Sequence, residues 1–135
     1  MKARLDHVGI VVRDLERALE FYRDALGLEV APAEPVVSQR VTVTDVALAG
    51  ARLELLQADD ADSPVGRFLG RRGPGLHHIT LAVDDLSVTL ARLRARGVRL
   101  IDETPRTGAG GSRIAFIHPS SAEGVLVELK ESTPG

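Results

Sequence analysis

The sequence predicts an α+β fold made of two tandem βαβββ modules within one domain of 135 residues. Three observations predict it. The stretch RLDHVGIVVRDL at residues 4–15 returns as GLHHITLAVDDL at residues 75–86. Both stretches alternate apolar and other residues as strands do, and both then change to helical spacing. Each half ends with two short apolar strands, and the second of these strands contains an apolar residue followed by Glu and Leu.

The repeat defines the elements of each module. His7 aligns with His78 at an offset of 71 residues (78 − 7). After the first strand of each module, an aspartate is the expected helix N-cap, and a glycine suits the left-handed position that follows the helix. We therefore expect one helix at Asp14–Leu26 and its counterpart at Asp85–Arg96.

The segment between the modules has its own start signal for a helix. We expect residues 1–57 to form the first module, residues 76–131 the second, and residues 58–75 a linker. Ser63 followed by Pro64 predicts a short linker helix, because serine caps a helix and proline suits its first turn. A single module would bury little apolar surface, so we expect the two modules to share one core.

Composition and charge exclude several classes of function. The chain is 44% hydrophobic and 27% charged, carries a net charge of −2 and has no cysteine. The charge gives no indication of a nucleic-acid partner. No apolar run approaches the ~20 residues of a membrane span, and the first residues lack the apolar region of a signal peptide. We expect a cytoplasmic protein with no membrane partner.

Strand alternation places one histidine of each module on the face away from the helix. Apolar residues at 8, 10 and 12 share one face, which leaves His7 on the other, and His78 has the same parity in the second copy. Glu54 and Glu128 likewise point away from their large apolar neighbours. Two modules related by a pseudo-twofold axis would bring these four residues to one central cleft. Two imidazoles and two carboxylates suit cobalt, manganese, nickel, zinc or iron.

Structural roles explain such residues in many proteins. A lone histidine in a strand is more often a hydrogen-bonded structural residue, and a glutamate near a strand end is usually solvated. The recurrence of all four residues at equivalent positions favours a metal site here. His77 has the opposite parity, and we expect a structural role for it.

The chain resembles the vicinal oxygen chelate superfamily of glyoxalase-like proteins. Within it, the methylmalonyl-CoA epimerase family is similar over nearly the whole chain, and the similarity is weakest at Ala31–Thr44. The segments that carry the resemblance are LDHVGIVVRDLERALEFYRDALGLEV, LELLQADDADSPVGRFLGRRGPGLHHI and LIDETPRTGAGGSRIAFIHPSSAEGVLVEL. The resemblance implies strongly curved mixed sheets around a central metal cleft, and a homodimer. It also implies four metal ligands, which are His7, Glu54, His78 and Glu128. Relatives often have Gln at the position of Glu54.

The resemblance implies epimerisation of (R)- and (S)-methylmalonyl-CoA. Removing the C2 proton between a thioester and a carboxylate creates an enolate, whose charge a divalent metal stabilises as a Lewis acid. Cobalt is the expected ion, and manganese, nickel, zinc and magnesium are the alternatives. The alternative functions are those of another glyoxalase-like isomerase or lyase, or of a non-catalytic member of the superfamily that binds a small molecule. An extradiol dioxygenase would use iron on two histidines and one carboxylate, whereas four ligand positions are filled here.

Two acid/base groups on opposite faces of C2 are needed for epimerisation. The resemblance implies that Glu128 is one of them. Many relatives carry a second glutamate where this chain has Val43 or Thr44. Asp45 shares the face of Val43, so Asp45 and a bound water are the candidates for the second group; a structural role for Asp45 fits the sequence equally well.

Coenzyme A needs contacts for its phosphates. The candidates end the linker helix or surround the TGAGGS loop, where glycine permits close approach of a ligand to the backbone. A solvated helix end and a flexible loop would explain the same residues without a ligand. The candidate contacts are Arg71, Arg72, Arg106, Gly110 and Arg113.

Overall fold

The computed structural model describes residues 2–132 and divides into two units. One unit holds residues 7–77, and the other holds residues 78–132 together with residues 2–6. Among the helices in this part of the chain, none is long and apolar enough to cross a membrane. The predicted module boundaries stay a prediction.

The unit of residues 7–77 contributes four strands of mixed direction, in the order β2-β3-β4-β1. Strands β1 and β4 run parallel, whereas β3 is antiparallel to both β2 and β4. The chain order is therefore the βαβββ order that the sequence predicts, followed by the linker helix. The elements are β1 (Arg4–Val11), α1 (Leu15–Leu19), η1 (Glu20–Ala25), β2 (Glu34–Val36), η2 (Val37–Gln39), β3 (Val41–Ala47), β4 (Arg52–Ala58) and α2 (Pro64–Arg72).

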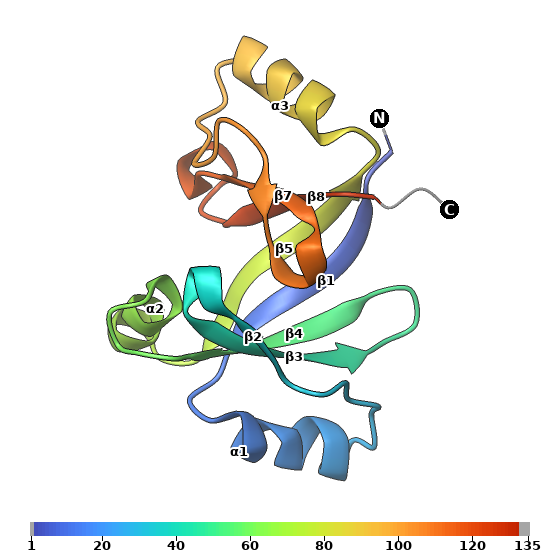
Figure 1. The fold of residues 1–135 in the computed structure, drawn as a ribbon, viewed down its shortest axis with the longest axis vertical. Helices are drawn as coiled ribbons and strands as arrows, with labels where there is room; N and C mark the ends of the chain where they lie inside the picture. Colours follow the sequence, from blue (N-terminus) through green and yellow to red (C-terminus); the bar gives the residue numbers. More distant parts are fainter. Residues whose placement is uncertain (1, 133–135) are drawn as a thin grey trace. The chain divides into compact units, whose positions relative to one another are not determined.

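The unit of residues 78–132 repeats this construction (Figure 1). Its sheet order is β5-β8-β7-β6, with β5 parallel to β8 and with β7 antiparallel to both β8 and β6. The repeated pairing confirms the second βαβββ module. Its elements are β5 (Gly75–Val83), α3 (Leu86–Ala95), β6 (Arg106–Thr107), η3 (Ala109–Gly111), β7 (Arg113–Ile117), η4 (Pro119–Ser121) and β8 (Val127–Glu131).

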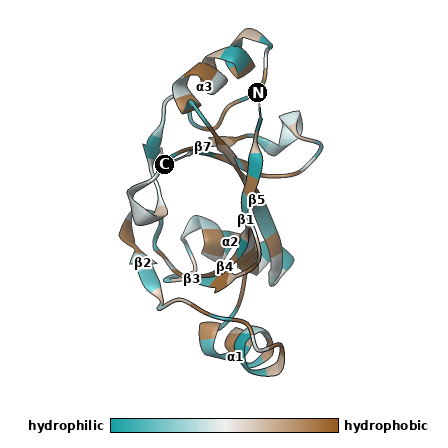
Figure 2. Cartoon of the chain, turned by 90° about the vertical axis from the view of Figure 1, so that its right-hand side faces the viewer, coloured by the Kyte–Doolittle hydropathy of each residue, from teal (hydrophilic) through white to brown (hydrophobic). Residues whose placement is uncertain are grey.

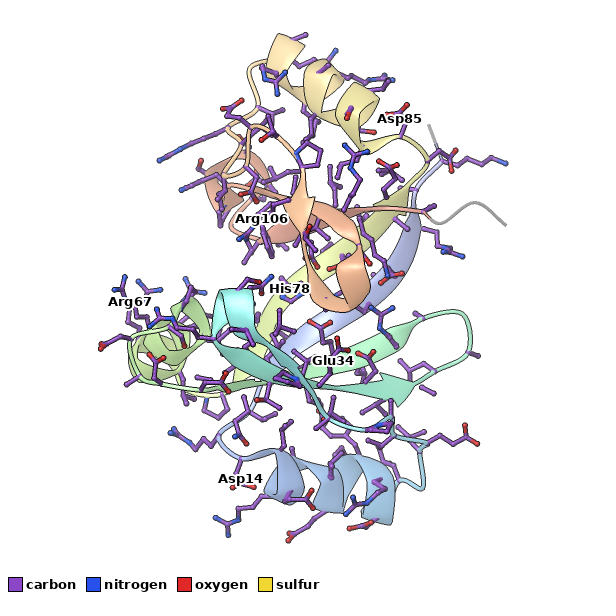
Figure 3. All side chains as sticks on the ribbon, viewed as in Figure 1. Asp14, Glu34, Arg67, His78, Asp85 and Arg106 are labelled. Carbon is purple, nitrogen blue, oxygen red and sulfur yellow. The ribbon has the colours of Figure 1, made fainter. Side chains whose placement is uncertain are left out.

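Both predicted helix caps form in the same way. The Asp14 carboxylate accepts a hydrogen bond from the backbone N–H of Arg17 at 3.0 Å, and Asp85 accepts one from Val88 at 3.0 Å. Figure 3 labels both aspartates at the starts of α1 and α3. Each cap satisfies a backbone donor that the first helical turn leaves unpaired. The cap is thus the local reason why both strands turn into helices at the same point of the repeat.

The first predicted helix differs in its second half. The α-helical segment ends at Leu19 and continues as the π-helical segment η1. The backbone N–H of Leu26 accordingly donates to the carbonyl of Phe21, five residues earlier, at 2.9 Å. The second helix, α3, runs as an α-helix to Ala95. Apolar spacing predicts that a helix forms but does not distinguish i−4 from i−5 hydrogen bonding.

One face of each sheet packs on the helix of its own unit. Figure 2 shows apolar and polar stretches alternating along α1 and α3, as expected for helices with one buried side. Sheet and helix bury one apolar cluster in each unit, so the polar residues of the strands lie on the opposite face. The buried members are Val12, Leu15, Leu19, Val46 and Leu55 in the first unit, and Val83, Leu86, Leu90, Ala115, Ile117, Val127 and Leu129 in the second.

The linker helix begins where the sequence predicts. The Ser63 hydroxyl accepts a hydrogen bond from the Gly66 N–H at 3.0 Å, and Pro64 occupies the first turn. A Cβ atom at Gly66 would lie 2.2 Å from the carbonyl oxygen of Asp60. Only glycine therefore allows the turn before α2 to pack so closely on the helix.

Candidate metal and substrate site

The first unit holds a buried histidine–glutamate pair on two parallel strands. The Nε2 atom of His7 lies 3.6 Å from Oε2 of Glu54, and the side chains are 4% and 9% exposed. In the register of β1 and β4, Gly9 stands opposite Glu54. His7 lies two residues before Gly9 and so shares its face. This is the parity that the sequence predicts.

The second unit contains the same pair. The Nε2 atom of His78 lies 3.6 Å from Oε1 of Glu128, with side chains 5% and 9% exposed. In the register of β5 and β8, Thr80 stands opposite Glu128, as Gly9 does opposite Glu54. The predicted parity is confirmed here as well, and each unit thereby offers one imidazole and one carboxylate.

The donor chemistry of each pair fits a divalent metal ion. Two ligand atoms that each lie about 2.1 Å from one ion are about 3.0–3.4 Å apart at tetrahedral or octahedral angles. The 3.6 Å separation in each pair is a small side-chain adjustment away from that range. Mixed nitrogen and oxygen donors suit first-row divalent metals.

The immediate surroundings of the two carboxylates differ. The hydroxyl of Thr80 donates a hydrogen bond to Oε1 of Glu128, and Thr80 is fully buried. The equivalent position in the first unit is Gly9, which has no side chain to donate. The ring of Phe116 also meets the ring of His78 edge-on, with centroids 6.1 Å apart. The strand parity placed Thr80 on this face, but its bond to Glu128 was not predicted.

Asp45 lies beside Glu54 in the sheet. The two residues are directly opposite in the register of β3 and β4, so their side chains share one face. Oδ1 of Asp45 lies 3.2 Å from Nε of Arg52. This ion pair is not predicted from the sequence, although Arg52 stands only two residues before Glu54. Both residues line a hollow of about 430 Å³. A small ligand can therefore reach Asp45, which is engaged in an ion pair.

The predicted coenzyme A contacts come from different elements of the two units. Arg71 and Arg72 lie exposed in the last turn of α2, and the guanidinium carbon of Arg72 is 5.7 Å from the ring centroid of Phe68. Gly110 lies within η3 and adopts a φ of 68°. Phe68 also meets the ring of His77 edge-on at 4.8 Å, in keeping with the structural role expected for that histidine.

The two arginines that flank the glycine-rich loop lie on opposite faces of one sheet. Arg113 bonds Glu131 at 3.0 Å and the Ser87 hydroxyl at 3.2 Å, on the face that α3 covers. Arg106 stands opposite Ile114, which in turn stands opposite Lys130. This register gives Arg106 the face of Glu128.

A sequence model of the glyoxalase/bleomycin resistance protein/dioxygenase superfamily matches residues 6–116. The chain belongs to this superfamily. It is 38% identical to the ethylmalonyl-CoA/methylmalonyl-CoA epimerase of Cereibacter sphaeroides over 133 residues, which cover 97% of this chain and 99% of that protein. The resemblance predicted from the sequence is thereby confirmed.

Two solved structures are similar to the chain over nearly its whole length. The methylmalonyl-CoA epimerase of Mycobacterium tuberculosis is 44% identical with a TM-score of 0.90, covering 97% of this chain and 89% of that one. A methylmalonyl-CoA epimerase in complex with methylmalonyl-CoA and NH4+ is 38% identical with a TM-score of 0.91, covering 98% and 96%. These superpositions confirm the predicted α+β fold of this superfamily.

Proposed function

We propose that the protein interconverts the (R) and (S) forms of methylmalonyl-CoA by moving the proton at C2. The observation that carries the proposal is the duplicated, buried histidine–glutamate pair in a chain whose relatives include methylmalonyl-CoA epimerases. Polar side chains that are costly to bury are retained twice at equivalent positions. Such a duplication is expected for a ligand set and is not needed for packing.

We propose that one divalent ion binds to both pairs together. Cobalt is our first choice, and manganese, nickel, zinc and magnesium are the alternatives. When bound, the ion supplies Lewis-acid stabilisation of the negative charge that develops on the thioester oxygen. The sequence repeat and the equal construction of the two pairs support this assignment. The proposed ligands are His7, Glu54, His78 and Glu128.

Glu128 is the proposed proton acceptor and donor on one face of C2. The Thr80 hydroxyl donates a hydrogen bond to its Oε1 atom, and this bond restricts the orientation of the carboxylate. A carboxylate whose position is fixed before substrate arrives loses less conformational entropy in the reaction. Asp45 or a bound water is the proposed group for the other face.

Hydrogen exchange tests the proposal directly. Methylmalonyl-CoA is incubated in D2O with metal-free protein and with protein reloaded with cobalt, and the C2 proton is followed by NMR. We expect deuterium to enter C2 in both epimers, and only with the metal. Binding of the thioester without exchange, when the protein has been loaded with each of the five ions in turn, would instead identify a non-catalytic member of the superfamily.

Binding of the coenzyme A portion is a separate part of the proposal. The exposed arginines at the end of α2 and the loop at residues 108–111 are proposed contacts, together with Arg113, because the pyrophosphate is a doubly charged anion. Each contact can be tested by the Kd of propionyl-CoA in single variants. The homodimer stays a prediction, which light scattering of the metal-loaded protein tests.

A further inference from the structure

We propose that Arg106 forms a preorganised subsite for an anionic oxygen group of the acyl-CoA substrate. The group is either the free carboxylate of the acyl portion or a phosphate of coenzyme A, which share the chemistry that a guanidinium recognises. This inference deepens the proposed function and rests on an acyl-CoA being the substrate. It singles out one arginine among the four predicted contacts.

Two neighbours contact the guanidinium of Arg106 and restrict its position. Its Nε atom lies 3.3 Å from Oδ2 of Asp102, and its Cζ atom lies 5.2 Å from the centroid of the Phe116 ring. Asp102 is itself anchored, because its Oδ2 accepts a hydrogen bond from the Phe116 N–H at 2.8 Å. One edge of the guanidinium is therefore held by an acid, and one flat face by an aromatic ring.

The opposite edge of the guanidinium remains available. Within residues 2–132, the Nη1 and Nη2 atoms of Arg106 have no hydrogen-bond partner, and the side chain is 45% exposed. These two nitrogens carry the paired N–H donors that bind a carboxylate or phosphate with two parallel hydrogen bonds. Because two contacts already restrict the side chain, less rotamer entropy is lost when an anion binds than for an arginine without such contacts.

Arg106 lies on the same side of the sheet as the residue proposed to move the C2 proton. It shares the sheet face of Glu128 through the β6–β7–β8 register, and the Phe116 ring contacts both Arg106 and His78. Figure 3 labels Arg106 and His78 within this unit. One aromatic ring, that of Phe116, thus lies next to both the guanidinium and the imidazole.

Arg113 differs from Arg106 in the surroundings of its guanidinium, although both lie in the same sheet. It lies seven residues further along the chain, but its terminal nitrogens are occupied by Glu131 and Ser87. Its side chain lies on the face covered by α3. The difference between the two arginines therefore lies in the availability of the guanidinium edge, since both carry the same charge.

The test measures Kd by calorimetry for two probes that separate the two anions. Methylmalonyl-pantetheine carries the carboxylate without phosphates, and propionyl-CoA carries the phosphates without the carboxylate. We expect Arg106→Gln to weaken one probe about tenfold, as for loss of hydrogen bonds to a charged group. Arg106→Lys, which keeps the charge but not the paired donors, should weaken it by a smaller factor.

Arg94→Gln is the matched control. Arg94 is 51% exposed and pairs with Glu103 at 3.0 Å, so its removal also deletes one half-exposed ion pair. Weakening of methylmalonyl-pantetheine by Arg106→Gln identifies the carboxylate, and weakening of propionyl-CoA identifies a phosphate. Equal Kd values for Arg106→Gln and Arg94→Gln with both probes overturn the inference.

The measurement separates this inference from the proposed function. If Arg106→Gln weakens the binding of a probe but the wild-type protein exchanges no C2 proton, the epimerase proposal is refuted and the anion subsite is supported. Wild-type protein that exchanges the proton while Arg106→Gln binds both probes normally refutes the subsite alone. Wild-type protein that binds neither probe and exchanges no C2 proton overturns both. Melting temperatures of all variants show that the proteins compared are folded.

Discussion

The two histidine–glutamate pairs have the same geometry but different neighbours. In both, a histidine nitrogen lies 3.6 Å from a glutamate oxygen, and the glutamate stands opposite the residue two places after the histidine. That residue is Gly9 in one unit and Thr80 in the other. The backbone thus duplicates the ligand arrangement, and single side chains distinguish the two carboxylates.

The next strand of each sheet adds a second difference. Asp45 stands opposite Glu54, whereas Phe116 stands opposite Glu128. The first glutamate therefore has an ion-paired carboxylate beside it, and the second has an aromatic ring that supports Arg106. If one carboxylate only binds metal and the other also moves a proton, the two glutamates need the same position relative to their histidines but different neighbouring side chains.

The largest effect expected from this difference is on catalysis. Glu128→Gln keeps an oxygen ligand of similar shape but removes its basicity, and loss of a general base costs ~10²–10⁴ in rate. Glu54→Gln should cost far less, because that residue is proposed only as a ligand. The C2 deuterium exchange rate at equal metal occupancy compares the two variants. Equal losses would remove the distinction between the carboxylates.

Asp45→Asn tests whether the neighbour of Glu54 is the second acid/base group. Loss of that group should slow interconversion by about 10², while exchange with solvent continues for one C2 epimer. Chiral analysis of the product beside NMR of the exchange measures both rates. Arg52→Gln is the companion variant, because it removes the ion pair and keeps the carboxylate. Interconversion at the wild-type rate in Asp45→Asn would leave bound water as the second group.

Removal of one histidine from each pair tests whether the pairs share an ion. Changing a residue that merely supports a ligand weakens metal affinity 10–100-fold, so loss of a ligand in His7→Ala or His78→Ala should cost at least ~10-fold. Titration of metal-free protein with cobalt gives the stoichiometry and the Kd. One ion per chain with both variants weakened is expected. Two independent ions, or unchanged affinity in His78→Ala, would mean that the pairs act separately.

The smallest effect concerns the hydroxyl that only one unit has. Thr80→Val removes the donor to Glu128 at nearly constant volume, and loss of a hydrogen bond to a charged group predicts about a tenfold lower kcat. KM should change little, because Thr80 is buried beneath the carboxylate. Thr80→Ser restores the hydroxyl and should restore most of the rate. An unchanged kcat in Thr80→Val would show that Glu128 is positioned without this bond.

Local sequence determined the elements and the parity of the candidate ligands. The aspartate caps and the apolar spacing are local properties, so both helices begin where the repeat predicts. Alternation with period two is also local, and it is sufficient to put His7 and His78 on the faces away from the helices. The repeat then made the same pattern visible twice, which is why a metal site could be predicted at all.

Only the tertiary structure decided which side chains meet across strands. Asp45 and Arg52 were seven residues apart in sequence without any local signal that they pair. The face of Arg106 depends on the register of β6, a strand of only two residues, and periodicity cannot define the register of so short a strand. The bond between Thr80 and Glu128 joins residues 48 positions apart. Such contacts follow from strand pairing, and strand pairing is set by the packing of the whole sheet and not by the local order of residues.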